Sequence, residues 1–334
     1  MTGIEMPESK LSRRRFLKIS AASASAVALF PGAAAAAPAI HRWTGIALGA
    51  GAEINLVHDD AQEARSLFGE IELEIARLEN IFSLYKSESE LSRLNRQGLL
   101  DGPSFDLLQL LSLAKQLHEA TGGAFDPTIQ PLWAYYAAGD YDSRLHKQAL
   151  SQTGFSKVQI ESGKIRFLAP GMALTLNGIA QGFITDRVSE LLKSKGFTNV
   201  AVDLGELRLN GIGESNAGEI QKGWPVTLRP DPKRKEFAEQ TTVSDMAVAS
   251  SAQTGTTFDE AGKTSHILDP RTGAPVRTDL SAVSVISRSA AVADGLSTAA
   301  LVLGEKGLKE ILALYVDTTA FAVRQNGETL WLDG

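Results

Sequence analysis

The order of helix-like and strand-like segments limits what this chain can fold into. Helix patterns cover residues 61–80, 104–120, 179–195, 290–303 and 306–314. Strands or hairpins are expected over residues 46–57, 153–168, 200–209, 282–287 and 320–332. These segments follow no regular strand–helix–strand rhythm, and neither an internal repeat nor a clean linker divides them. The sequence therefore predicts an α+β fold, with mixed and largely antiparallel sheets, packed helices and intertwined subdomains.

The N-terminus has the features of an export signal. Residues 12–18 are basic, residues 19–30 are apolar, and a run of small residues follows Pro31-Gly32. The apolar stretch is shorter than the roughly 20 residues that a membrane span needs. The paired arginines before Phe-Leu-Lys resemble the twin-arginine signal. We therefore expect residues 1–37 to be a twin-arginine signal peptide and the mature chain to be periplasmic, with no transmembrane span.

Charge and composition exclude several classes of protein. The net charge of the 334 residues is −6, and residues 1–37 contain five basic and two acidic side chains, so the remainder carries −9. An acidic chain is a poor candidate for a nucleic-acid-binding protein. The absence of cysteine excludes disulfides, thiolate metal sites and cysteine nucleophiles. The sequence also lacks the GxGxxG, Walker A, HExxH and GxSxG motifs.

Two segments have the residue types of a metal and phosphate site. Asp294 and Thr298 lie four apart on a predicted helix, hence on one face, and their oxygens suit a hard cation such as Mg²⁺. Alternatively, they form a solvated helix face, or the threonine bonds back to the preceding turn. Gly178 and Gly182 lie where a strand turns into a helix, whose free N–H groups favour an anion. A plain strand–helix turn is the other interpretation.

Three further positions are candidates for ligand contact. His266 precedes an Asp-Pro turn and could act as a base or bind a phosphate-bearing ligand, or be a structural histidine. Phe125 could stack on a planar ring, with Asp126 next to it for a polar edge of that ring. Tyr85 is a second possible stacking side chain. Both aromatic residues could equally belong to the core.

Taken together, the motifs resemble the ApbE family of FAD:protein FMN transferases. Individually they are weak, but seven in family order between Leu48 and Gly304 are specific. They read FSLY with SELSRLN, GGAFDPT, LTLNGIAQGF with DRV, VDLGEL, SHILDPRTGAPV, a strand over 282–287, and VADGLSTAALVLG. The resemblance implies that residues 43–334 form one ApbE-like domain. It also implies an enzyme that cleaves FAD and attaches FMN through a phosphoester to a Thr or Ser of a partner flavoprotein, releasing AMP.

The resemblance also implies roles for individual residues. Mg²⁺ would be bound by Asp294, Thr298 and the Gly178 carbonyl, and His266 would be the general base beside Asp294 in catalysis. FAD contacts are expected at Leu48, Tyr85, Ala124, Phe125, Asp126, Thr175, Gln181 and Ile267. The stretch from Trp43 to Ala50 is similar to the NosX branch, which flavinylates the membrane-bound protein NosR during nitrous oxide reductase maturation, so a NosR-like acceptor is implied.

Several positions depart from the family pattern. Thr175 stands in place of Asp, Asn177 and Gln181 replace the Gly and Lys of a GGIAKG-type turn, Glu206 replaces the second Gly of VDLGG, and Leu48 replaces Met. Two alternatives therefore stay open. The same site could hydrolyse FAD as an Mg²⁺-dependent pyrophosphatase, or the chain could be a non-catalytic periplasmic protein that binds or delivers flavin.

Overall fold

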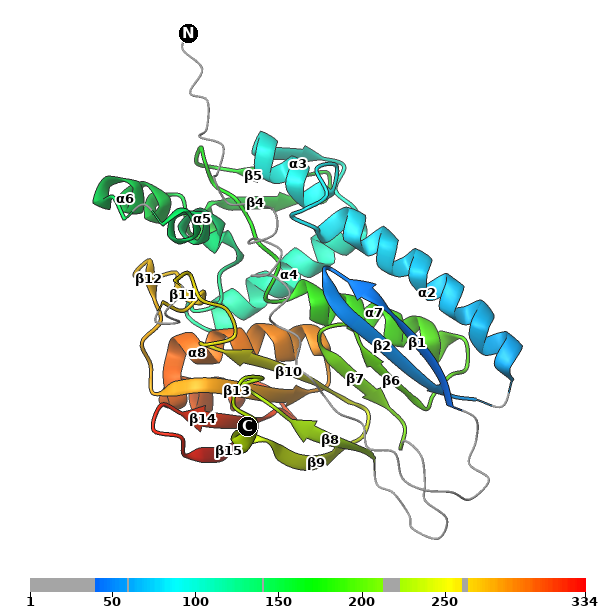
Figure 1. Cartoon of the computed structure of the whole chain (residues 1–334). Coiled ribbons are helices and arrows are strands. Elements are labelled where there is room, and N and C mark those ends of the chain that lie inside the picture. Colours follow the sequence, from blue (N-terminus) through cyan, green and yellow to red (C-terminus); the bar gives the residue numbers. More distant parts are fainter. Residues whose placement is uncertain (1–39, 59, 140, 213–222, 260–263) are drawn as a thin grey trace.

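The computed structural model describes residues 40–58, 60–139, 141–212, 223–259 and 264–334 (Figure 1). The predicted signal peptide lies outside these residues. The described part contains seven α-helices: α2 (Ala61–Phe82), α3 (Glu90–Gln97), α4 (Phe105–Ala120), α5 (Gln130–Ala138), α6 (Ser143–Ser151), α7 (Ala180–Ser194) and α8 (Ala290–Leu312). None of the helices described is both long and apolar enough to cross a membrane.

One antiparallel sheet runs through the centre of the molecule, and all of its neighbouring strands are antiparallel. In spatial order its strands are β1 (Ile40–Ala47), β2 (Ala50–Val57), β6 (Val200–Asp203), β7 (Leu207–Asn210), β10 (Met246–Ala252), β13 (Leu280–Ser287), β14 (Thr319–Arg324) and β15 (Thr329–Asp333). Smaller sheets pair β3 (Leu99–Asp101) and β4 (Val158–Glu161) with β5 (Lys164–Phe167), β8 (Trp224–Leu228) with β9 (Glu239–Val243), and β11 (Leu268–Asp269) with β12 (Ala274–Pro275). The predicted α+β class is confirmed.

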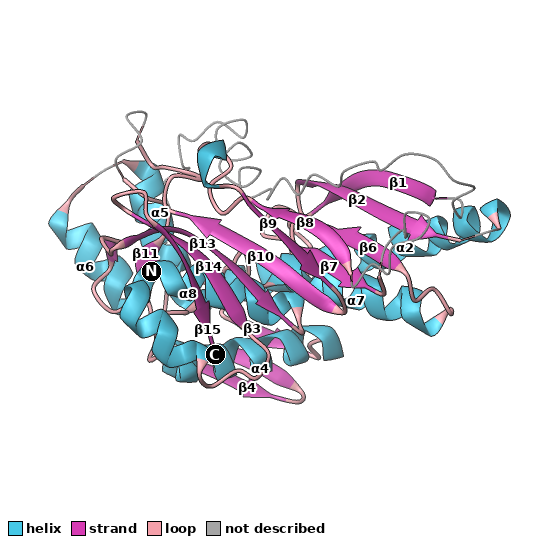
Figure 2. Ribbon diagram, turned by 90° about the horizontal axis from the view of Figure 1, so that it is seen from below, coloured by secondary structure: helices cyan, strands magenta, loops and turns pink. Residues whose placement is uncertain are grey.

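The central sheet is covered on both faces. Figure 2 shows helices α7 and α8 beneath it, and the β8–β9 hairpin lies on the other side. Because side chains alternate along a strand, successive residues of β6 enter different cores. Val200 and Val202 pack in the main cluster with the helices, whereas Ala201 packs with Trp224 and Val226 of β8.

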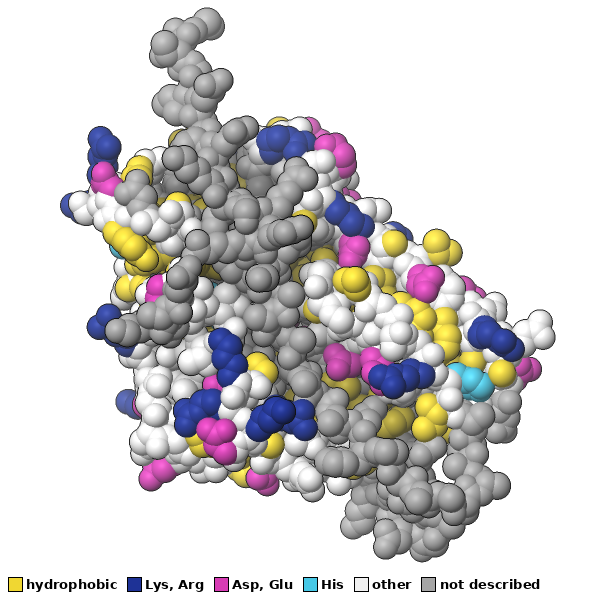
Figure 3. Space-filling view, in the orientation of Figure 1, with side chains coloured by type: hydrophobic (Ala, Val, Ile, Leu, Met, Phe, Trp, Pro, Cys, Tyr) yellow, Lys and Arg dark blue, Asp and Glu magenta, His cyan; other side chains and the backbone are white. Residues whose placement is uncertain are grey.

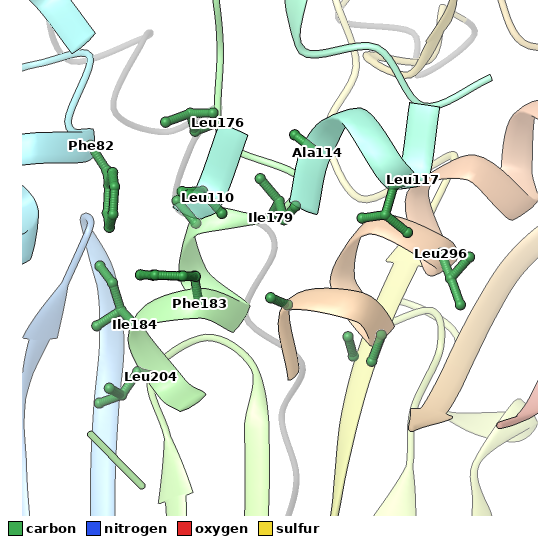
Figure 4. Packing of buried hydrophobic residues seen from close by; sticks show 14 of the residues in the cluster. Phe82, Leu110, Ala114, Leu117, Leu176, Ile179, Phe183, Ile184, Leu204 and Leu296 are labelled. Carbon is green, nitrogen blue, oxygen red and sulfur yellow. The ribbon is translucent and has the colours of Figure 1, made fainter. Parts of the chain in front are cut away.

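The main core lies where α4, α7 and α8 meet. Figure 4 shows Leu110 and Leu117 of α4 pointing toward Phe183 of α7 and Leu296 of α8. Leu110 and Leu117 are completely buried, and Phe183 and Leu296 nearly so. The buried cluster extends from Ala47 to Leu332, so nearly the whole described chain contributes to one core.

Two expected strands are in fact hairpins. The segment 46–57 contains the end of β1 and all of β2, because Leu48 and Gly49 adopt positive φ angles of 46° and 85° and reverse the chain. The segment 200–209 is divided into β6 and β7 at Gly205, whose φ is 102°. The predicted hairpins over 153–168 and 320–332 are confirmed as β4–β5 and β14–β15.

Charges of both signs are mixed over the described part of the surface. Figure 3 shows Lys and Arg side chains interspersed with Asp and Glu on one face. Many of them pair, as in Arg324 with Glu328 at 2.8 Å and Arg234 with Glu236 at 3.2 Å. Exposed pairs of this kind contribute little to stability, but they prevent a strong field of one sign.

Candidate active site

One cavity of about 190 Å³ brings the predicted site residues together. It is lined by the turn after β1, the loop after α4, the segment leading into α7, the segment before β11, and α8. It is lined by all twelve residues to which the family resemblance assigns a role: Leu48, Tyr85, Ala124, Phe125, Asp126, Thr175, Gly178, Gln181, His266, Ile267, Asp294 and Thr298. Their individual roles stay predictions.

A close approach of two helices positions Asp294. A Cβ on Gly182 in α7 would collide with the Ala290 carbonyl oxygen and lie 2.6 Å from the Ala291 Cα, both in the first turn of α8. Only glycine permits this contact. One consequence is that the Gly182 N–H donates a hydrogen bond to Asp294 Oδ2 over 3.4 Å.

The start of α8 is fixed by a carboxylate from α7. Asp186 accepts hydrogen bonds from the Ala290 N–H at 2.9 Å, the Ala291 N–H at 3.0 Å and the Ser289 hydroxyl at 2.7 Å. Unpaired N–H groups and the helix dipole make a helix N-terminus a favourable place for a carboxylate. Burial nevertheless raises the pKa of Asp186, although these hydrogen bonds oppose that shift.

Neutral oxygens lie around Thr298, one turn of α8 after Asp294. A Cβ on Gly178 would lie 3.1 Å from Thr298 Oγ1, so the Gly178 backbone comes close to that hydroxyl. Ser251 Oγ, from β10, lies 3.5 Å from Thr298 Oγ1 and 2.8 Å from Ser297 Oγ. Carboxylate, hydroxyl and carbonyl oxygens are the donor types that Mg²⁺ prefers.

The acidic side chains here are buried without a basic partner. Asp294 and Glu206 are 4% and 3% exposed, and neither forms an ion pair with any residue that the structure describes. Burial raises the pKa of both carboxyls, and repulsion from Asp294 and Asp203 raises the pKa of Glu206 further. No group of three or more His, Asp or Glu side chains within the described ranges forms a metal site by itself. A divalent cation fits here, because it would neutralise two carboxylates that otherwise repel each other.

His266 is held as a neutral imidazole. Its Nδ1 lies 2.8 Å from the Thr256 carbonyl oxygen, an acceptor, so Nδ1 carries the proton and Nε2 keeps its lone pair. Burial lowers the pKa of His266 to about 4. At neutral pH the ring is therefore uncharged and able to accept a proton.

The aromatic side of the cavity mixes exposed and buried rings. Tyr85 is 38% exposed, whereas Phe125 is 5% exposed and packs in the main core as well as lining the cavity. The Asp126 carboxylate accepts two backbone hydrogen bonds that stabilise the loop after α4. Its Oδ1 accepts from the Thr128 N–H at 2.8 Å, and its Oδ2 accepts from the Phe155 N–H at 3.1 Å. Both of its carboxylate oxygens therefore already have protein donors.

Two of the departures from the family pattern lie side by side. The Gln181 amide rests against the turn between β6 and β7, because a Cβ on Gly205 would lie 2.5 Å from Gln181 Nε2. Glu206 is the next residue of that turn and lines the same cavity. Thr175 has a local contact as well, since its Oγ1 accepts from the Asn177 N–H at 3.3 Å.

Sequence reasoning did not assign Asp186, Glu206 or Ser251 to the site. Asp186 was visible within the DRV motif and Glu206 as a departure from VDLGG, but their contacts join segments about 90 to 100 residues apart. Ser251 gave no local signal, because β10 was not recognised as a strand.

Comparison with known proteins identifies the class of protein. The model of the ApbE family matches residues 48–321. The FAD:protein FMN transferase of Haemophilus influenzae is 30% identical over 270 residues, which cover 74% of this chain and 77% of that protein. That of Vibrio cholerae is 29% identical over 73% of this chain and 75% of its own length.

Solved structures agree with this likeness. The apo form of Pseudomonas stutzeri flavinyl transferase ApbE aligns with a TM-score of 0.76 and 25% identity, covering 90% of this chain and 96% of that one. Vibrio cholerae flavin transferase ApbE aligns with a TM-score of 0.75 and 25% identity over 88% and 98%. The chain belongs to the ApbE family.

Proposed function

We propose that this chain is an Mg²⁺-dependent transferase that cleaves FAD and attaches FMN through a phosphoester to a Thr or Ser of an acceptor flavoprotein, releasing AMP. Relatives named FAD:protein FMN transferase support the activity. The observation that carries the proposal is the buried Asp294, without a basic partner, in one cavity with Thr298, Gly178 and His266.

The residues of this cavity suit an in-line displacement at phosphorus. The carboxylate of Asp294, the hydroxyl of Thr298 and the carbonyl of Gly178 would hold the cation. Bound there, Mg²⁺ would polarise the diphosphate and neutralise charge on the departing AMP. The acceptor hydroxyl forms the new P–O bond, the bond to AMP breaks with its electron pair, and His266 Nε2 takes the hydroxyl proton.

A mass measurement tests this function. The purified protein is incubated with FAD, Mg²⁺ and a candidate acceptor, and the acceptor is weighed. We expect a mass gain of one FMN group and an equal amount of AMP, both lost with EDTA or in Asp294→Asn. Equal release of free FMN and AMP without acceptor labelling would instead indicate an FAD pyrophosphatase. Tight FAD binding with no AMP would indicate a flavin-binding or delivery protein.

The place of action and the acceptor are proposed from the sequence. The basic and apolar segments within residues 1–37 support twin-arginine export to the periplasm, and the resemblance of residues 43–50 to the NosX branch supports a membrane-bound NosR-like acceptor. Replacing Arg13 and Arg14 together by Lys should retain the protein in the cytoplasm. Periplasmic recovery of that variant would contradict the route, and an unlabelled NosR-like protein would contradict the acceptor.

A further inference from the structure

Glu206 lines this cavity, and its carboxylate has no role in the proposed displacement. It follows Gly205 in the turn between β6 and β7, and the backbone of that turn is fixed from two sides. The Leu204 N–H donates to the Glu206 carbonyl oxygen at 3.1 Å, and the Thr185 hydroxyl of α7 donates to the same oxygen at 3.2 Å. The side chain is thus anchored between the sheet and α7.

The Glu206 side chain is buried but incompletely satisfied. Its one hydrogen bond comes from the Ser250 N–H, and its Oε2 has no partner among the residues that the structure describes. No described Lys, Arg or His forms an ion pair with it. The neighbouring Gln181 amide makes no hydrogen bond to it either. A buried carboxylate oxygen left in this state destabilises the fold unless a ligand supplies the missing contact.

The surroundings of Glu206 indicate which ligand would do so. Glu206 and Asp294 line the same cavity and repel each other, and Asp203 adds further repulsion. The hydroxyls of Thr298 and Ser251 line it too. An anion or a neutral donor would leave this repulsion in place, whereas a divalent cation removes it and takes oxygen ligands of these types.

We propose that Glu206 is a second carboxylate ligand of the divalent cation, in addition to Asp294. The inference rests on the proposed function, because it concerns the same cation site. It assigns that site two carboxylates, contributed by a β-turn and by a helix. More ligand charge tightens cation binding, so this chain should bind the cation before the flavin arrives.

Titration with Mn²⁺ tests the inference without any turnover. Binding is followed calorimetrically and by the loss of the free-ion electron paramagnetic resonance signal, first with Mn²⁺ alone and then with ADP present. We expect Glu206→Gln to weaken Mn²⁺ binding at least tenfold, and Glu206→Gly to do the same. Asp203→Asn is the matched control, because it removes a negative charge at the same turn from a residue that does not line the cavity. Its affinity should change less than threefold.

Thermal unfolding separates a ligand from a merely structural residue. Mn²⁺ should raise the Tm of the unaltered protein and of Asp203→Asn more than that of Glu206→Gln. Without cation, Glu206→Gln should be as stable as the unaltered protein or more stable, because a repulsive charge is gone. A variant that loses stability with and without Mn²⁺ alike, at unchanged affinity, would overturn the inference.

The outcomes also distinguish the inference from the function on which it rests. If Asp294→Asn abolishes Mn²⁺ binding while both Glu206 variants bind normally, the second ligand is wrong and the proposed function stands. If the unaltered protein binds no Mn²⁺ with or without ADP, both are overturned.

Discussion

Replacing Gly182 by Ala would test how the contact between α7 and α8 positions Asp294. The added Cβ meets backbone atoms of Ala290 and Ala291, so no side-chain rotation can relieve the collision. The two helices must separate where the Gly182 N–H donates to Asp294. We therefore expect Gly182→Ala to lower both the stability of the fold and its affinity for Mn²⁺.

Two opposing effects set the size of the stability change. Ala favours an interior helical position over Gly by about 1 kcal/mol. Overpacking a tight contact typically costs about 1–3 kcal/mol. The expected net loss in the free energy of unfolding is therefore up to about 2 kcal/mol, measured by urea denaturation with an unchanged slope. Mn²⁺ affinity is measured on the same samples.

Gly69 provides the matched control. It also lies within a helix, α2, but a Cβ there meets nothing within 4 Å. Gly69→Ala should therefore gain about 0.5–1 kcal/mol and leave Mn²⁺ affinity unchanged. If Gly182→Ala proves as stable as Gly69→Ala and binds Mn²⁺ normally, the close helix contact does not position the carboxylate.

Three other changes have defined outcomes. Asp186→Ala removes three hydrogen bonds at the start of α8 and should cost about 2 kcal/mol in urea unfolding; no loss would contradict the capping role. Thr298→Val should weaken Mn²⁺ binding at least tenfold, with Thr298→Ser near normal, and equal affinities would remove the hydroxyl from the ligand set. The pKa of His266 falls from 6.5 in the unfolded chain to about 4 in the fold. The stability that the neutral ring contributes is therefore fully present above pH 6.5 and is lost as pH falls toward 4. His266→Gln should therefore reduce the acid loss of stability by about 2–3 kcal/mol relative to the unaltered protein; identical pH profiles would refute this.

Local periodicity predicted the four longest helices, α2, α4, α7 and α8, although it divided α8 near Gly304, whose φ is 73°. It missed the short helices α3, α5 and α6 and placed the strand boundaries poorly. The apolar spacing of residues 61–80 matches α2, which begins after the Asp60 cap. The strand expected over 200–209 is a hairpin, because its apolar residues continue across Gly205 and conceal the turn. β10 was missed because it is rich in Ala and Ser, which have low strand propensity, although it lies at the centre of the sheet.

The candidate site was predictable to the extent that its residues share a local pattern. Asp294 and Thr298 were found because their spacing puts them on one helix face. The contact of Glu206 with the same cavity depends on how a β-turn packs against α7, and no spacing along the chain encodes that. The family resemblance supplied the segments, and the fold supplies the contacts between them.

The segments 178–186 and 290–298 nevertheless share a spacing of four residues between their contact positions. This spacing explains how α7 and α8 meet. Gly182 and Asp186 lie four residues apart on one face of α7, and Ala290, Asp294 and Thr298 follow at intervals of four on one face of α8, whereas Gly178 continues the spacing in the turn just before α7. Where two such faces cross in opposite directions, each step of four along one helix meets a step of four back along the other. The contacts follow this register: Gly178 lies against Thr298, Gly182 bonds Asp294, and Asp186 caps Ala290. Contacts one turn before and one turn after Asp294 therefore hold this part of α8 in place, and the Gly182 N–H bonds the carboxylate between them.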